Sequence, residues 1–166
     1  MKVLIVDKLP RIIKSKRKLE RILKVKITNR GKEVSISGKP EDEYTAEKVI
    51  DAINFGFNFS TAVLIKEQGH VFETLNIKDY TKRHDLERVR ARIIGKKGKT
   101  MNTLNQLTKC EFQLKDNRVG IIGDPEHIEN AQNAVIHLIK GAKQANVYSF
   151  LEKHQAKPII DLGLKE

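Results

Sequence analysis

The stretch RIIGKKGKT, residues 92–100, carries two glycines three positions apart with two lysines between them. Two kinds of phosphate chemistry fit this pattern. Its second half, GKKGKT, resembles the end of a nucleotide-binding P-loop, in which a glycine-rich turn, a lysine and a hydroxyl hold a nucleoside triphosphate. Alternatively, two helices that meet at a Gly-x-x-Gly turn can grip the backbone of a single nucleic-acid strand.

The P-loop interpretation fails two structural requirements. With Gly98, Lys99 and Thr100 taken as the end of the motif, its first glycine would fall at Ile93. A P-loop also follows a buried strand, whereas LERVRARII (86–94) has apolar residues at helical spacing and four charged side chains. The sequence therefore argues against a nucleotide-dependent enzyme.

The Gly-x-x-Gly interpretation meets its requirements. Gly95 and Gly98 tolerate the backbone angles of a sharp turn, and their lack of side chains lets a phosphodiester backbone come close. The free amides at the start of the following helix, near Lys99, would point at phosphate. Lys96 and Lys97 add positive charge at the tip. A glycine turn without any ligand is the remaining alternative.

Positive charge is concentrated in two segments of a chain whose formal net charge is +11. Residues 1–30 carry eleven Lys and Arg against two acidic residues, and residues 82–99 carry eight against two. Focused positive charge favours a polyanion, either nucleic acid or an anionic membrane, over a merely solvated basic surface. The candidates in the first segment form a secondary basic patch: Lys14, Lys16, Arg17 and Lys18.

Residues for catalysis or metal binding do not stand out. The single cysteine, Cys110, excludes an internal disulfide and a multi-cysteine zinc site, and the five histidines have no metal-ligand spacing. We therefore expect no catalytic residues, no metal, no cofactor and no enzymatic activity. The first apolar run, VLIV (3–6), is too short for a signal peptide or a membrane span, so we expect a cytoplasmic protein.

The elements that must position the glycine turn occur twice. VSISGKPE (34–41) aligns with VGIIGDPE (119–126) at an offset of 85 residues, and the same offset aligns Gly56 with Gly141. Upstream, RIIK (11–14) aligns with RIIG (92–95) at an offset of 81, so four residues were gained or lost between these segments. The pattern predicts a tandem duplication of one α/β unit.

We expect one unit over residues 1–69, a second over 70–155, and a C-terminal tail at 156–166 whose apolar residues dock on the body or on a partner. In the first unit, the sequence Lys-Ser-Lys-Arg (14–17) stands where the second has Gly-Lys-Lys-Gly. Since both glycines are missing, the first unit is expected to be degenerate.

Strand, helix, Ile-Gly-x-x-Gly, helix, strand, loop, strand and helix is the order of a type I KH domain. IIGKKGKTMNTL (93–104) resembles the KH signature, with Met101 a mild departure. The resemblance implies an α+β fold of two tandem type I KH units (βααββα), each a three-stranded sheet with helices on one face. A KH groove holds single-stranded RNA, and the turn KDNR (115–118) would form its opposite wall.

By this resemblance one of the two isoleucines at positions 93 and 94 should face the core. The residues expected to bind RNA are Arg92, Ile93, Ile94, Gly95, Lys96, Lys97, Gly98, Lys99, Thr100 and Arg118.

The resemblance extends along about residues 1–155. INFGFNFSTAVLI (53–65), IKDYTKRHDL (77–86) and LIKGAKQANVYSFLEK (138–153) are similar to segments of the "partner of Nob" family of KH proteins, particularly its archaeal members. This implies a small-ribosomal-subunit assembly factor that binds near the 3′ end of immature rRNA. The implied partners are a PIN-domain endonuclease and the α subunit of translation initiation factor 2. The alternative is an interaction scaffold with incidental RNA affinity.

Overall fold

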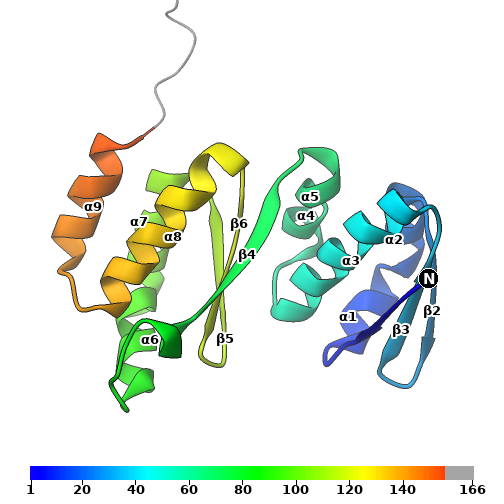
Figure 1. The fold of residues 1–166 in the computed structure, drawn as a ribbon, viewed down its shortest axis with the longest axis horizontal. Helices are drawn as coiled ribbons and strands as arrows, with labels where there is room; N and C mark the ends of the chain where they lie inside the picture. Colours follow the sequence, from blue (N-terminus) through cyan, green and yellow to red (C-terminus); the bar gives the residue numbers. More distant parts are fainter. Residues whose placement is uncertain (156–166) are drawn as a thin grey trace, which may run out of the picture.

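The computed structural model describes residues 1–155, in which two α/β units follow one another along the long axis of the molecule (Figure 1). The first unit comprises β1 (Lys2–Ile5), α1 (Leu9–Lys14), α2 (Lys16–Leu23), β2 (Lys26–Arg30), β3 (Glu33–Ser37) and α3 (Pro40–Phe55). Two short helices, α4 (Phe59–Ala62) and α5 (Leu64–Glu67), lead to the second unit. The second unit comprises β4 (Val71–Asn76), the 3₁₀ turn η1 (Ile77–Asp79), α6 (Leu86–Ile94), the 3₁₀ turn η2 (Lys96–Gly98), α7 (Lys99–Thr108), β5 (Glu111–Lys115), β6 (Arg118–Gly123), α8 (Pro125–Ile139) and α9 (Gln144–Lys153). The tail expected at 156–166 lies outside the described residues.

Each unit has a three-stranded antiparallel sheet whose central strand is the last in sequence, in the orders β1-β3-β2 and β4-β6-β5. Alternation along the strands sends one set of side chains toward the helices. Ile27 faces its partner Ile36 in the first sheet, and Phe112 faces Ile121 in the second; all four are buried. The expected α+β fold of two type I KH units is confirmed.

The duplication is visible in the backbone at the offset found in the sequence. Lys24 ends α2 and Lys109 ends α7, both in the left-handed conformation with φ of 59°. Gly56 and Gly141 follow α3 and α8 with φ of 136° and 102°. Non-glycine residues seldom adopt positive φ, so its recurrence at both equivalent lysines shows that the two units share more than their order of elements.

A second pair of glycines at the same offset, Gly38 and Gly123, packs closely against one side chain in each unit. A Cβ atom on Gly38 would lie 2.9 Å from Cγ1 of Val25, and one on Gly123 would clash with Sγ of Cys110. Val25 and Cys110 are themselves 85 residues apart. The buried thiol thus takes the place that an aliphatic side chain has in the first unit, as expected of a small hydrophobe.

The two units share a packed interface. The face of the second sheet away from its own helices packs on the C-terminal end of α3, where the ring centroids of Phe55 and Phe57 each lie 5.7 Å from that of Phe72. Ile122 of β6 is buried with the core of the first unit. A Cβ on Gly120 would stand 2.6 Å from the Phe55 ring, so glycine at 120 lets that ring lie flat on the sheet.

A polar contact closes the edge of this interface. Nζ of Lys115 in β5 lies 3.2 Å from a carboxylate oxygen of Asp7 and donates to the main-chain carbonyl of Asn54 at 3.4 Å. The Asn54 side chain in turn accepts from the amides of Asp7 and Lys8. The end of α3 is therefore in contact with both units at the edge of this interface.

Burial raises the pKa of the Cys110 thiol from its ordinary 9.0 to about 11. At pH 8 this reduces the thiolate fraction on the order of 100-fold, so a disulfide exchange reagent should react with the native protein at least that much more slowly than with protein unfolded in urea. Because the folded-state pKa is the higher one, the stability that this thiol contributes is present below pH 9 and declines as the pH rises toward 11. Equal reaction rates of Cys110 in the native and the unfolded protein would contradict the raised pKa of the buried thiol.

Candidate nucleic-acid interface

Four residues connect α6 to α7, and three of them have positive φ. Gly95 has φ 79° and ψ 171°, Lys97 has φ 57°, and Gly98 has φ 76° and ψ 11°. The amide of Gly98 donates to the carbonyl of Gly95 at 3.1 Å, which closes the turn. The angles of Gly95 belong to a region that is almost restricted to glycine, so this turn is a specified conformation.

The two glycines have different roles. A Cβ atom on Gly95 would lie 2.6 Å from Cβ of Thr100 and would clash with the Thr100 hydroxyl. Nothing lies within 4 Å of the corresponding position at Gly98, so that side of the turn is open. Gly95 therefore lets the turn close on α7, and Gly98 leaves a bare backbone on the surface. The Thr100 side chain is only 6% exposed, so its predicted contact with RNA stays a prediction that involves its main-chain amide.

The start of α7 carries no intramolecular counter-charge among the described residues. Gly98 at the N-cap offers no side chain, and the first turn has no acidic residue. The start of α8 is different: Asp124 accepts from the amide of Glu126 at 2.9 Å, and Glu126 adds negative charge. Since helix N-termini attract anions, the start of α7 is left available for an external phosphate.

Lysines surround this helix start. The three lysines of the turn region are exposed, and with polar side chains of α7 they line an open depression of about 500 Å³. Its lining residues are Lys96, Lys97, Lys99, Asn102, Thr103 and Gln106. The set contains no carboxylate, so its chemistry suits a polyanion.

Ile93 and Ile94 have separate environments. Ile93 is fully buried in the core of the second unit, whereas Ile94 is 39% exposed beside the turn. Only Ile94 can therefore offer an apolar surface to a base, and the expectation that Ile93 contacts RNA is corrected. The equivalent residue of the first unit, Ile13, is 46% exposed.

Arg92 is committed to the fold. Its guanidinium donates to the carbonyl of Leu138 at 2.6 Å and to the carbonyl of Ala142, at the C-terminal end of α8. In the first unit Arg11 donates to the carbonyls of Gly56 and Phe57, both at 3.3 Å, beyond the end of α3. A cation that satisfies free carbonyls at a helix end stabilises that end. The repeated contact gives Arg92 a structural role in the fold, and its predicted RNA contact stays a prediction.

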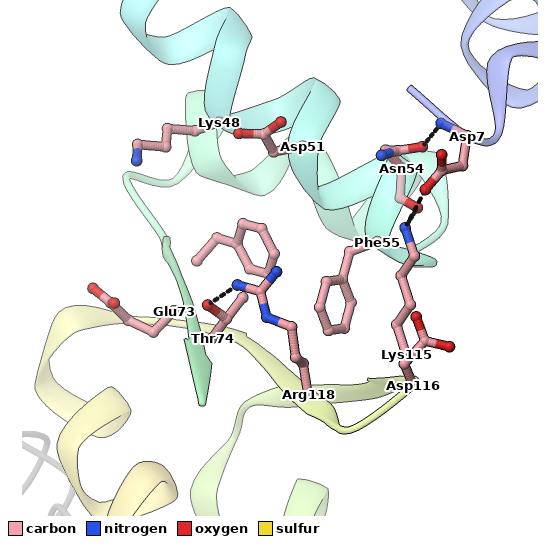
Figure 2. A pocket seen from close by; sticks show the side chains of 11 residues that line it. Asp7, Lys48, Asp51, Asn54, Phe55, Glu73, Thr74, Lys115, Asp116 and Arg118 are labelled. Carbon is pink, nitrogen blue, oxygen red and sulfur yellow. Dashed lines mark hydrogen bonds and ion pairs between the residues drawn. The ribbon is translucent and has the colours of Figure 1, made fainter. Parts of the chain in front are cut away.

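Arg118 lies on the other side of the sheet. Val119 and Ile121 face the helices, so Arg118 faces the first unit, where it donates to Oγ1 of Thr74 at 2.9 Å (Figure 2). There it borders a cleft between the units rather than a wall beside the glycine turn. The structure therefore does not bring Arg118 together with the lysines of the glycine turn, and its predicted RNA contact stays a prediction.

Arg90 is a contributor that the sequence did not single out. From α6 it donates to Oδ1 of Asn117 at 2.8 Å, in the turn between β5 and β6. The main chain of Asn117 also accepts from the amide of Ile77 at 2.8 Å. These contacts hold the 115–118 turn relative to α6 and hence relative to the glycine turn. Helical spacing placed Arg90 on a helix, but it could not reveal a partner 27 residues away.

Comparison with known proteins decides the family. Residues 71–156 match the model of a eukaryotic-type KH domain, KH type I, in its form as the second KH domain of PNO1. The chain belongs to the PNO1/Dim2 family of KH-domain proteins. Dim2p from Pyrococcus horikoshii has a similar structure, with a TM-score of 0.84 and 29% identity over 92% of this chain and 98% of that one.

Other members of the PNO1/Dim2 family agree with this assignment. A second Pyrococcus horikoshii structure, a complex of a/eIF2alpha, aDim2p and rRNA, matches with a TM-score of 0.82 and 30% identity over 92% of both chains. KH domain-containing protein MJ0443 of Methanocaldococcus jannaschii is 33% identical over 115 residues, 69% of this chain and 51% of that protein. Pre-rRNA-processing protein PNO1 of Eremothecium gossypii is 34% identical over 105 residues, 61% of this chain and 39% of that protein. The chain thus spans about 39–51% of the length of these two curated relatives.

The first KH-like unit of this family member lacks the glycine turn altogether. α1 ends at Lys14 and α2 begins at Lys16, so Ser15 alone joins them. The offset also changes from 81 to 85 across this region, so the first unit is shorter here. Lys14, Arg17 and Lys18 remain exposed and Lys16 is half-buried, so the basic patch persists without a turn that could admit a phosphate backbone.

Substitutions at the two glycines should separate their roles. Gly95→Ala meets both a forbidden conformation and Thr100, so we expect a loss of roughly 2 kcal/mol or more in the free energy of unfolding. Gly98→Ala meets only the left-handed conformation and should cost about 1 kcal/mol. Urea unfolding of both variants measures the difference. Equal losses would show that Gly95 does not close against Thr100.

The structural role of Arg92 predicts a stability defect. Arg92→Met removes the donors to two carbonyls and should lower the free energy of unfolding by about 2 kcal/mol. Arg88→Met is the matched control, because Arg88 is largely exposed and its ion pair with Asp85 spans 4.0 Å. Urea unfolding should show little change for the control. If the two variants were equally stable, Arg92 would not be holding the end of α8.

Proposed function

We propose that this protein binds single-stranded RNA through its second KH unit. The observation that carries the proposal is the turn at residues 95–98, whose backbone is bare at Gly98 and which opens onto a helix start without a counter-charge. The exposed lysines at 96, 97 and 99 attract phosphate, and Ile94 supplies an apolar edge for a base. Unpaired bases are accessible to such a groove, whereas bases inside a duplex are not.

We propose further that the RNA is the 3′-terminal region of small-subunit rRNA or of its precursor. The support comes from the family: curated relatives are pre-rRNA-processing proteins, and one matching structure is a complex with a/eIF2alpha and rRNA. The protein would act as a non-catalytic assembly factor. Its proposed protein partners are the α subunit of translation initiation factor 2 and a PIN-domain endonuclease that trims the rRNA.

The missing turn of the first unit favours a different role for that unit. With a single residue between α1 and α2, it has no equivalent of the bare backbone at Gly98. Its basic patch can add affinity for any polyanion but has no groove for selecting a sequence. A scaffold function, in which the first unit mainly holds a protein partner, is the second candidate.

A titration with single-stranded RNA tests the proposal. The ligand is an oligonucleotide matching the 3′ end of the organism's own small-subunit rRNA, with a shuffled sequence as comparison. Lys96→Asp/Lys97→Asp should weaken binding of the matched RNA at least tenfold, because it reverses the charge at the tip of the turn. Lys39→Asp/Lys66→Asp, at two exposed lysines of the first half of the chain, makes the same change in net charge and should have a smaller effect.

The salt dependence of these affinities counts the phosphates. For single strands the slope of log K against log salt is about −0.7 per phosphate contact, so the Lys96/Lys97 variant should show a shallower slope. Equal affinity of the wild type for matched and shuffled RNA, or equal losses in both double variants, would move the scaffold function ahead.

A further inference from the structure

A groove follows the seam between the two units, on a different surface from the glycine turn. It consists of two adjoining hollows of about 560 and 290 Å³. Both are lined by Lys48 of α3 and by Phe72 and Glu73 of β4, so they form one continuous depression. Figure 2 shows the larger hollow, with α3 on one side and β4 on the other.

The groove runs along the outer edge of β4. Successive side chains of a strand point to opposite faces of its sheet, so a hollow lined by both Glu73 and Thr74 must pass around the strand edge. In the described part of the chain β4 pairs only with β6 and stands at the end of the sheet order. One row of main-chain donors and acceptors over Val71–Asn76 is therefore available for another strand.

Each cation of the groove has a contact partner, whereas three carboxylates of the larger hollow, Asp51, Glu73 and Asp116, form no ion pair within residues 1–155. Nζ of Lys115 pairs with Asp7, and Arg118 donates to Thr74. Lys48 lies over the ring of Tyr44, with its Nζ 5.5 Å from the ring centroid.

Asp51 is half-buried, and its pKa is raised by desolvation and then by Glu47, one helical turn away. An approaching phosphate would be repelled by these carboxylates, whereas a cation would neutralise them.

The smaller hollow is suited to an apolar side chain. It is bordered by Tyr44, which is 60% exposed, and by the half-buried side chains of Ile65 and Phe72. An exposed tyrosine beside half-buried apolar residues is typical of a binding pocket rather than of a solvated surface. The groove thus offers a strand edge, carboxylates that form no ion pair within residues 1–155, and an apolar pocket.

We propose that the edge of β4 binds an extended segment of a partner protein, which adds a fourth strand to the second sheet. The segment carries a Lys or Arg that pairs with Glu73 and an apolar side chain that enters the pocket beside Tyr44. Main-chain pairing supplies affinity, and the two side chains supply selectivity. This surface is separate from the glycine turn, so one molecule can hold RNA and a protein segment together.

The test is a selection of binders from a phage-displayed library of random linear dodecapeptides, with the full chain as the immobilised target. The enriched peptides are expected to alternate apolar residues around a Lys or Arg. Synthetic versions should bind Glu73→Arg at least tenfold more weakly than wild type. Glu129→Arg, at an exposed glutamate of α8, makes the same charge change and should leave the affinity within twofold. Lys96→Asp/Lys97→Asp should also leave it unchanged, which separates this site from the RNA site.

Hydrogen exchange locates the contact. Bound peptide should slow exchange of amides within residues 71–76, because new main-chain bonds form along the edge. Failure of the selection to enrich such peptides, or protection elsewhere, would overturn the proposal.

Three other occupants of the edge would also overturn it. Protection of 71–76 in free protein that is lost on removing residues 156–166 would show that the chain's own tail is the occupant. Protection lost on dilution would show a second copy. Protection by single-stranded RNA would show a nucleic-acid groove.

Discussion

The turn between α6 and α7 is the constraint on which the candidate RNA site depends. Four residues join these helices, and three of them, Gly95, Lys97 and Gly98, adopt positive φ. The contact of Gly95 with Thr100 closes the turn from behind, so that the bare backbone at Gly98 and the start of α7 face outward together. The lysines add charge to a geometry that the backbone has already set.

The two units show what this turn adds to a common scaffold. Both have the same sheet order, the same left-handed lysine at the end of the second helix and the same arginine at the end of the long helix. They differ at the junction of the first two helices, which is Ser15 alone in one unit and four residues in the other. The scaffold is therefore independent of the turn, and the turn is the element that makes one copy a candidate RNA-binding unit. The packing of α3 against the second sheet keeps the copies together whether or not the first one binds RNA.

The fold could be predicted because its signals are local and repeated. Alternation marked the strands, helical spacing marked α6 and α8, and a gapless offset of 85 residues marked the duplication. The glycine turn could be predicted because its residues are adjacent in sequence. Contacts between side chains and groups far away in the sequence could not be predicted. Whether Arg92 faced RNA or the end of α8 depended on a carbonyl 46 residues away, and what lies against the strand face of Arg118 depended on how the second sheet meets α3. The groove at β4 could not be predicted from the sequence either, because its lining comes from both units.

The central claim, that the second unit holds RNA at its glycine turn, is tested most directly by backbone amide NMR of the full chain on addition of a short single-stranded rRNA fragment. The account predicts that the largest shift changes fall on residues 95–101, with smaller ones in the 115–118 turn that Arg90 holds, and that the Ser15 junction changes little. Changes concentrated on α1 and α2, with residues 95–101 unaffected, would contradict it and would place the RNA on the unit without a turn.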